Sequence, residues 1–417
     1  MTDSRISHFP QIGLRKGTYM LSYDKKRLGI YIHIPFCVSK CAYCDFNSAP
    51  PQNPEIVSRY ISAVIAHMES YRDAGSSYEP DTVFIGGGTP TSIPTEELAR
   101  LIKAVKKNFR LTRNAEFSIE ANPATVDFEG LKKLAKLGVN RISFGLQSAN
   151  DPELKALSRR HTRRDFVRSY QMARASGFLN INTDLMFGIP YQTMDSLLHT
   201  LSFITRVGPE HISLYDLKIE PGTRFYREYD KIAPYLPSED TEADMYERAV
   251  AFLARCGYYQ YEISNFARPG RMCAHNLKYW NCDEYLGFGV SAHSFFNGSR
   301  FSFTPELERY IAGVTDPASK IRITAENEVV EPRERLGEYI MLRFRLNAGL
   351  EEREFARRFG ASFTALYGQK VRRFIDGGYM TYKNGRYALT PRGMFVSNYI
   401  LSDILEFEDF GKYMFGN

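Results

Sequence analysis

Apolar and polar positions follow a pattern that repeats six times in the first half of the chain. Each repeat has a short apolar run, and then a longer stretch in which apolar residues recur three or four positions apart. Short apolar runs bounded by turn residues predict strands, whereas the longer spacing predicts helices. The predicted strands are residues 28–35, 82–85, 116–121, 141–146, 181–187 and 211–219. The predicted helices between them are residues 54–71, 95–109, 128–137, 151–176 and 195–207.

Strands that alternate with helices at intervals of about 30 to 50 residues are successive βα units. Such units build a parallel sheet with helices outside it. Six of them predict an α/β fold, a partial (β/α)6 barrel of the TIM type. In this kind of fold, functional side chains collect at the carboxyl ends of the strands.

The rest of the chain is predicted to form smaller parts around this barrel. Residues 1–24 lack sustained periodicity and are expected to be a flexible leader, so Met20 competes with Met1 as the start. The barrel is expected at 25–235. A connecting region is expected at 236–324, and it contains a helix near 239–256 and a glycine-rich tight loop. The last part, 325–417, is expected to be winged-helix-like, because it carries helices at 331–345, 350–359 and 362–376 and a hairpin at 379–390.

Charge and hydropathy narrow the class of protein. The chain has 54 basic and 48 acidic residues, and a net charge of +6 is too small to argue for nucleic acid. In the predicted winged helix, Lys370, Arg372 and Arg373 form no wider basic face, so docking or covering a site is the expected role of this module. No apolar run reaches the roughly 18 residues of a membrane span, and no signal-peptide core is present. Six cysteines in 417 residues favour a reducing cytoplasm over a disulfide scaffold.

Three of these cysteines follow the first predicted strand. Cys37, Cys41 and Cys44 have the spacing C-x3-C-x2-C within the stretch YIHIPFCVSKCAYCDF. A cubane iron–sulfur cluster normally takes four thiolates, so three in one loop leave one iron open to a substrate or cofactor. Half of a zinc site or a redox pair are the alternatives. A second C-x-x-C is missing, however, and a redox pair does not need Cys37.

Polar or glycine residues stand at the ends of the next strands. The second strand ends in Gly86-Gly87-Gly88-Thr89-Pro90, where missing side chains let backbone amides approach a ligand. A plain tight turn is the alternative for this run. The polar side chains at or after the later strands are Glu120, Gln147, Arg159 and Asp184, with Arg159 placed in the helix after the fourth strand.

Three phrases, IHIPFCVSKCAYCDF, FIGGGTPT and HNLKYW, resemble the radical S-adenosylmethionine superfamily over about residues 28–400. The similar branch contains the oxygen-independent coproporphyrinogen III dehydrogenases and their haem-chaperone relatives of the HemW type. The resemblance implies that Cys37, Cys41 and Cys44 ligate a 4Fe-4S cluster. It also implies a pocket for S-adenosylmethionine lined by Tyr31, Tyr43, Gly87, Gly88, Thr89, Glu120, Gln147, Arg159 and Asp184. Carboxylates there suit a ribose diol and a cationic sulfonium.

One departure from the dehydrogenase branch affects the expected activity. That branch continues the last C-x-x-C with glycine and a further cysteine, whereas this chain has Asp45-Phe46. The departure and the phrase HNLKYW are similar to the haem-chaperone branch, which implies a protein that binds haem and passes it to acceptor proteins. The alternative is a radical enzyme acting on a tetrapyrrole, as a coproporphyrinogen oxidase does. A flavodoxin or ferredoxin is expected as a possible electron donor.

The phrase HNLKYW also supplies a candidate haem ligand, His275. Imidazole is the commonest protein ligand of haem iron, and Tyr279 and Trp280 could cover a porphyrin face. The alternative is structural: His275 and Asn276 bond a loop while the two aromatic rings pack in the core.

Overall fold

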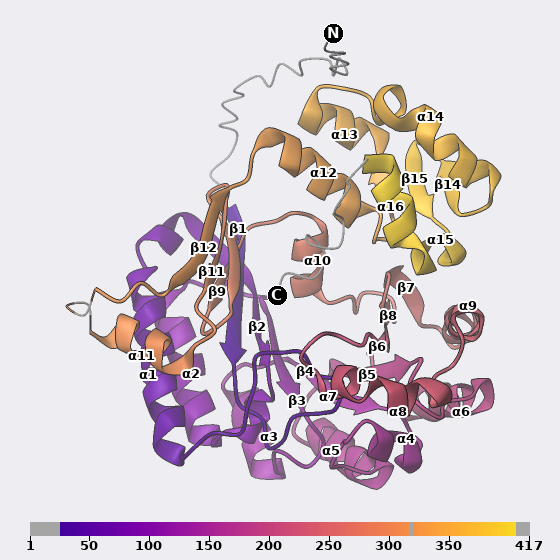
Figure 1. The fold of residues 1–417 in the computed structure, drawn as a ribbon. Helices are drawn as coiled ribbons and strands as arrows, with labels where there is room; N and C mark the ends of the chain where they lie inside the picture. The colour runs from indigo at the N-terminus through magenta and orange to yellow at the C-terminus, as the bar shows by residue number, and fades with distance from the viewer. Residues whose placement is uncertain (1–25, 317, 319, 406–417) are drawn as a thin grey trace. The chain divides into compact units, whose positions relative to one another are not determined.

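The computed structural model describes residues 26–316, 318 and 320–405, so the expected leader lies outside the described residues. The described chain folds as two compact units. We call residues 26–331 the sheet unit and residues 332–405 the C-terminal unit (Figure 1). Within the described residues, no helix has both the length and the apolar character needed to cross a membrane.

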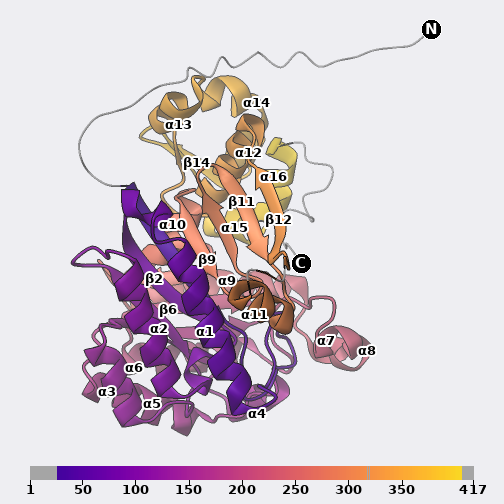
Figure 2. The ribbon, with the colours of Figure 1, turned by 90° about the vertical axis from the view of Figure 1, so that its left-hand side faces the viewer.

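Six parallel strands form the centre of the sheet unit in the order of the sequence. They are β1 (Lys26–Ile34), β2 (Tyr78–Gly87), β3 (Glu116–Ala121), β4 (Arg141–Gln147), β5 (Ile181–Phe187) and β6 (His211–Asp216). The helices that alternate with them are α1 (Pro54–Ser70), α2 (Thr95–Asn108), α3 (Phe128–Lys136), α4 (Asp151–Ala156), α5 (Arg163–Ala175) and α6 (Met194–Val207). Figure 2 shows these helices along one side of the sheet. The predicted α/β architecture is confirmed.

The single helix predicted at 151–176 is wrong, because the chain forms two helices there. Ser158 has a positive φ of 59°, which ends α4. Thr162 then caps α5: its hydroxyl accepts the amide of Asp165, whose carboxylate accepts the amide of Thr162. This capping box is visible in the sequence as Thr-x-x-Asp. Arg159 therefore lies in the connection between two helices rather than within one.

Six further strands extend the sheet on both sides, in the order β12-β11-β10-β9-β1-β2-β3-β4-β5-β6-β8-β7. Their bounds are β7 (Tyr259–Glu262), β8 (Asn265–Ala267), β9 (Tyr285–Phe288), β10 (His293–Phe296), β11 (Ser299–Phe303) and β12 (Thr324–Val329). β9 lies parallel to β1, whereas β10, β11 and β12 continue antiparallel. Residues 236–324 thus contribute strands to the sheet as well as connections.

Short helices complete the sheet unit. They are α7 (Arg224–Arg227), α8 (Tyr229–Ile232), α9 (Glu239–Arg255), α10 (Ala274–Trp280) and α11 (Leu307–Thr315). The predicted tight loop around Gly287 and Gly289 is the turn from β9 to β10. A Cβ on Gly287 would lie 2.2 Å from the carbonyl oxygen of His293, so only glycine fits at this position.

The C-terminal unit combines helices with a small antiparallel sheet. Its elements are α12 (Pro332–Arg343), β13 (Leu350–Glu351), α13 (Glu352–Phe359), α14 (Phe363–Asp376), β14 (Met380–Lys383), β15 (Arg386–Leu389), α15 (Pro391–Phe395) and α16 (Ser397–Leu405). Asn384 and Gly385 both have positive φ, as a two-residue hairpin turn requires. The helices and the hairpin match the predicted winged-helix-like pattern.

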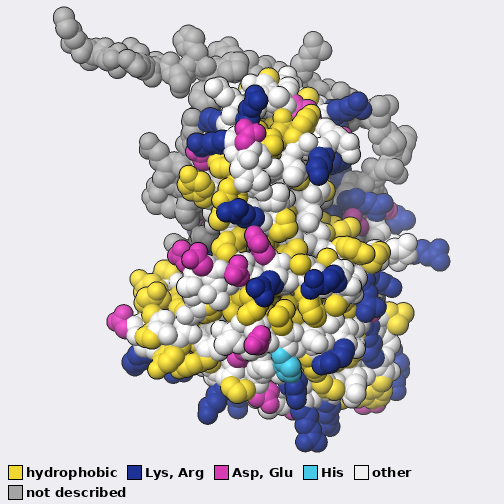
Figure 3. Space-filling view, turned by 90° about the vertical axis from the view of Figure 1, so that its right-hand side faces the viewer, with side chains coloured by type: hydrophobic (Ala, Val, Ile, Leu, Met, Phe, Trp, Pro, Cys, Tyr) yellow, Lys and Arg dark blue, Asp and Glu magenta, His cyan; other side chains and the backbone are white. Residues whose placement is uncertain are grey.

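Charged side chains of both signs are interspersed on the surface. On the face drawn in Figure 3, Lys and Arg are most frequent along the lower edge, at the level of α4 and α5 in Figure 1.

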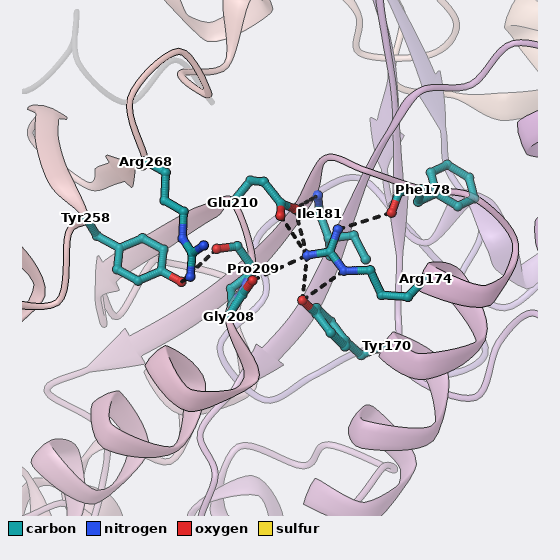
Figure 4. A network of polar contacts seen from close by, with 9 residues as sticks. All are labelled: Tyr170, Arg174, Phe178, Ile181, Gly208, Pro209, Glu210, Tyr258 and Arg268. Carbon is teal, nitrogen blue, oxygen red and sulfur yellow. Dashed lines mark hydrogen bonds and ion pairs between the residues drawn. The ribbon is translucent and has the colours of Figure 1, made fainter.

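A polar network ties together the amino-terminal ends of β5 and β6 (Figure 4). Glu210 accepts the amide of Ile181 at 3.0 Å and the guanidinium of Arg174 at 2.8 Å. Arg174 also donates to the hydroxyl of Tyr170 and to the carbonyl of Phe178. In such sheets this end carries stability and the opposite end carries function.

Candidate functional site

The cysteine loop leaves the carboxyl end of β1 and is closed at its base by backbone bonds. The amide of Cys37 donates to the carbonyl of Ala49 at 3.1 Å, and the amide of Ala49 donates to Pro35 at 3.0 Å. In the middle of the loop, Ala42 is buried against Leu157, whose carbonyl accepts its amide at 3.2 Å. The loop is therefore held at both its base and its centre.

The three predicted cysteine ligands lie together in this loop. Cys37 is buried, and Cys41 and Cys44 are half-buried. Burial, and then the charges of Cys41 and Cys37, raise the pKa of Cys44 to about 11. Thiolates that repel one another in this way need a cationic centre.

The donor set favours a cluster over a single ion. Cys37, Cys41 and Cys44 bring three thiols into one short loop, which is the donor chemistry of iron–sulfur clusters. Among the described residues, no three His, Cys, Asp or Glu side chains converge on one metal ion, so this ligand set stays a prediction. The zinc alternative gains no support, and the three cysteines fit the cluster.

The glycine run at the end of β2 packs against the cysteine loop. A Cβ on Gly88 would lie 2.6 Å from the carbonyl oxygen of Phe36 and 3.0 Å from the sulfur of Cys37. The amides of Gly88 and Thr89 donate to Ile34 and Phe36, at 2.8 and 2.7 Å. The sequence suggested that these amides are open to a ligand, but in the structure they hold the strand end to the loop.

Two carboxyl groups, Glu120 on β3 and Asp184 on β5, are close enough for the charge of one to act on the other. Burial, and then the charge of Asp184, raise the pKa of Glu120 to about 8. The pKa of Asp184 is also raised by burial, although hydrogen bonds from Ser143 and Asn182 oppose this. Glu120 accepts the amide of Gly87 at 3.0 Å. Two buried acids with raised pKa values favour a ligand that brings positive charge.

Tyr31 and Tyr43 lie on either side of this region. The hydroxyl of Tyr31 bonds the Nδ1 of His33 at 3.0 Å, and its ring stacks on Phe84. Its pKa is raised by burial and then by the charge of Glu120. Tyr43 packs beside Ala42, and its pKa is raised by burial while Arg159 opposes the shift. Both rings are thus near the charged groups that the family resemblance places around the cofactor.

Arg159 connects the strand ends to the cysteine loop. It donates to the carbonyl of Gly145 at 2.6 Å, to the side chain of Asn122 and to the sulfur of Cys41 at 3.3 Å. A Cβ on Gly145 would lie about 3 Å from the side chains of Asn122, Arg159 and Gln147, so these three converge there. Gln147 has a positive φ of 69°, a strained conformation that is frequent at functional sites.

The sequence interpretation missed two polar residues at strand ends. Asn122, directly after β3, donates to the hydroxyl of Thr89 at 2.7 Å and so links two strand ends. Asp216 ends β6. Its Oδ1 and the carboxyl group of Glu242 both border the position that a Cβ on Gly188 would take, so the two carboxyl groups lie near each other. Burial, and then Asp216, raise the pKa of Glu242 to about 7. The strand-end rule applied in full to the third strand would have found Asn122, but the predicted sixth strand ran to residue 219 and so placed Asp216 inside it.

His275 lies away from any open ligand position. His275 is only 1% exposed. Its Nδ1 is hydrogen-bonded to the hydroxyl of Thr82 at 2.9 Å, and its Nε2 to the hydroxyl of Tyr279 at 2.9 Å. Burial lowers its pKa to about 3, and its ring stacks on Phe84. Both ring nitrogens are bonded within the protein, which gives the side chain a structural use, and the role of His275 as a haem ligand stays a prediction.

A hollow of about 240 Å³ opens beside the cysteine loop. Its lining comes from the loop, from the ends of β2 and β3 and from the α4–α5 connection. The residues are Val38, Ser39, Cys41, Thr89, Asn122, Pro123, Ala124, Thr125, Ser158, Arg159, Arg160, His161 and Asp165.

Comparison with known proteins assigns the family. Residues 31–204 match the radical SAM superfamily, and residues 330–396 match the HemN C-terminal domain. A Bacillus subtilis protein named heme chaperone HemW is 36% identical over 90% of this chain and 98% of its own length. The protein of the same name from Escherichia coli is 33% identical over 90% and 97%. The solved structure of E. coli coproporphyrinogen III oxidase (HemN) superposes with a TM-score of 0.80 at 22% identity, covering 94% of this chain and 91% of that one, which shows the shared fold. With relatives this similar along almost their whole length, the chain belongs to the HemW family of the radical SAM superfamily.

Proposed function

We propose that this protein binds haem and passes it to acceptor proteins, and that it carries a 4Fe-4S cluster and S-adenosylmethionine. The observation that carries the proposal is the match to proteins named heme chaperone HemW along nearly their full length. Membership of the radical SAM superfamily implies the cluster and S-adenosylmethionine. All six cysteines are free thiols in the structure, which fits a reducing compartment, and we place the protein in the cytoplasm.

The roles proposed for the side chains follow from their positions. Cys37, Cys41 and Cys44 hold the cluster, and Arg159 fixes the loop through Cys41. When bound, the cluster and S-adenosylmethionine supply one-electron cleavage of a carbon–sulfur bond. Glu120 and Asp184 bind the positive charge of the cofactor, and Tyr31, Tyr43 and Gln147 enclose it. The family resemblance assigns Gly87, Gly88 and Thr89 to its methionine end.

The first test is the cluster itself. Purified without oxygen, the protein should be brown and contain iron and acid-labile sulfide, and changing Cys37, Cys41 and Cys44 together to alanine should remove both. Circular dichroism of the triple variant controls for folding. Iron and sulfide retained at wild-type levels in a folded triple variant would contradict the assignment.

The second test is haem binding and transfer. Titration of the full-length protein with haem should give a Soret band, and mixing with a haem-free acceptor protein should move that band to the acceptor. No binding by the wild-type protein would contradict the proposal. His275→Ala should keep the haem affinity and coordination of the wild type, since His275 bonds Thr82 and Tyr279. A loss of coordination in a variant with unchanged thermal stability would restore His275 as the ligand.

A radical enzyme acting on a tetrapyrrole is the second candidate. It is supported by the two carboxyl groups with raised pKa values, Glu120 and Asp184, because such groups gather at catalytic sites. The measurement that separates the two is formation of 5'-deoxyadenosine by the reduced holoprotein, with and without a porphyrinogen. Cleavage that depends on the porphyrinogen would favour the enzyme.

A further inference from the structure

Arginine is concentrated in the connection between α4 and α5 and in the first turns of α5. Five of the ten residues from 159 to 168 are arginines, and one is acidic. Arg159 turns inward to Cys41, whereas the others are exposed. Arg160, Arg164 and Arg168 form no hydrogen bond or ion pair with any residue that the structure describes, and we call these three the arginine rim.

The acidic groups near the arginine rim are occupied by backbone contacts. Asp165 accepts the amide and hydroxyl of Thr162, and these bonds hold its pKa below the usual value. Asp151 accepts the amide of Arg163 at 2.8 Å. The rim arginines form no ion pair with these two carboxylates, although the charge of Arg164 also contributes to the lowered pKa of Asp165.

One residue of the arginine rim borders the same hollow as the cysteine loop. Arg160 lines it from one side, and Val38, Ser39 and Cys41 line it from the other. Arg168 lines an adjoining hollow of about 670 Å³ that shares Asp165 with the first. The positive charge thus lies next to a cysteine of the proposed cluster, and Figure 3 shows basic side chains along this edge of the sheet unit.

The cysteine loop also exposes apolar side chains. Val38 is 53% exposed and Phe46 is 61% exposed, and Lys40, also exposed, donates to the carbonyl of Phe46 at 3.0 Å. Apolar residues surrounded by charged ones are typical of protein–protein interfaces. An exposed loop that carries cluster ligands has no packing reason to display a phenylalanine.

We propose that the arginine rim and the exposed tip of the cysteine loop form the docking surface for an acidic one-electron carrier protein. The inference rests on the proposed function, because it requires the cluster. In the transfer, the reduced carrier loses one electron and the cluster gains it, and no bond or proton is exchanged. Opposite charges steer such partners together and align them. A nucleic acid would instead need a longer basic track.

The test compares two triple variants with the same change in net charge. Arg160, Arg164 and Arg168 are changed together to glutamate in one. Three exposed arginines on α6 and α9, Arg206, Arg248 and Arg255, are changed to glutamate in the other. Binding of a flavodoxin to the full-length holoprotein is measured by calorimetry at low and physiological salt, and cluster reduction is followed by stopped flow with reduced flavodoxin or with dithionite.

The arginine-rim variant should bind flavodoxin roughly tenfold or more weakly, as expected when steering charges are reversed. Its reduction by flavodoxin should slow while reduction by dithionite stays normal, and the α6–α9 variant should behave like wild type. Equal weakening in both variants, or no binding by wild type at low salt, would overturn the proposal. So would binding of a short RNA or an anionic vesicle that depends on the rim while flavodoxin binding does not. Iron content and the haem Soret band of the same samples report separately on the proposed function.

Discussion

Single atoms decide how closely the strand ends approach the cysteine loop. Gly88 has a φ that other residues adopt, yet a Cβ there would meet the Phe36 carbonyl and the Cys37 sulfur. Gly88→Ala should therefore fold but bind substantially less iron, because the loop must shift away from β2. Gly368→Ala on α14 is the control, since its Cβ meets only a flexible threonine side chain and alanine favours a helix. Iron analysis after anaerobic reconstitution checks this, and wild-type iron content in Gly88→Ala would contradict it.

Glu120 gives the protein a predictable dependence on pH. Its pKa is about 8 in the folded state and close to 4.5 when unfolded, so the folded state holds the proton between these values. Stability without cofactor should therefore fall as pH rises from about 4.5 to 8. Glu120→Gln should remove this part of the decline and be more stable than wild type at pH 8. Urea midpoints at several pH values test it, with exposed Glu247→Gln as control. Parallel curves for Glu120→Gln and wild type would contradict the expectation.

At this scale the sequence located residues better than it assigned their contacts. Glu120 and Gln147 stand at or next to strand ends, as predicted, whereas Asp184 lies in the middle of β5. The partners of His275 could not be predicted, because Thr82 is 193 positions away along the chain and only the pairing of distant elements brings them together.

Among the elements, the opposite end of the sheet offers a contrast to the site. Glu210→Gln removes the ion pair with Arg174 but leaves the carboxyl end of the strands untouched. Because the pair is partly open to solvent, the loss of unfolding free energy should be about 1 kcal/mol. Iron content should be unchanged. Denaturant unfolding and iron analysis check both parts, and a variant that lost iron at normal stability would show that this network supports the site.

The six parallel strands were predictable because each carries its own apolar run and is followed by a helix. The strands from β7 to β12 were not, because several have only three or four residues and depend on pairing with distant partners. The error that merged α4 and α5 passed over the polar run at 158–165, in which Thr162 caps a new helix.

For the whole molecule, similarity to a coproporphyrinogen oxidase in fold does not carry the reaction with it. Cys44 is followed by Asp45-Phe46, both exposed, rather than by glycine and a further cysteine. We expect no conversion of coproporphyrinogen III to protoporphyrinogen by the reduced holoprotein with S-adenosylmethionine. Chromatography of the porphyrins after oxidation measures this, with a coproporphyrinogen oxidase as positive control. Decarboxylated product at more than one equivalent per protein would contradict it.

The pairing of β9 with β1 also constrains when the protein can mature. One edge of β1 is covered by β2, but the other waits for Tyr285–Phe288, which the ribosome makes about 250 residues later. At typical rates of synthesis that interval lasts roughly 12 to 50 s. During this interval, the strand that carries the cysteine loop has an open edge. The hydroxyl of Tyr60 also lacks the hydrogen bond that the amide of Val290 later donates to it. We therefore expect iron and sulfide to be loaded late in the life of the nascent chain, after most of the protein has left the ribosome.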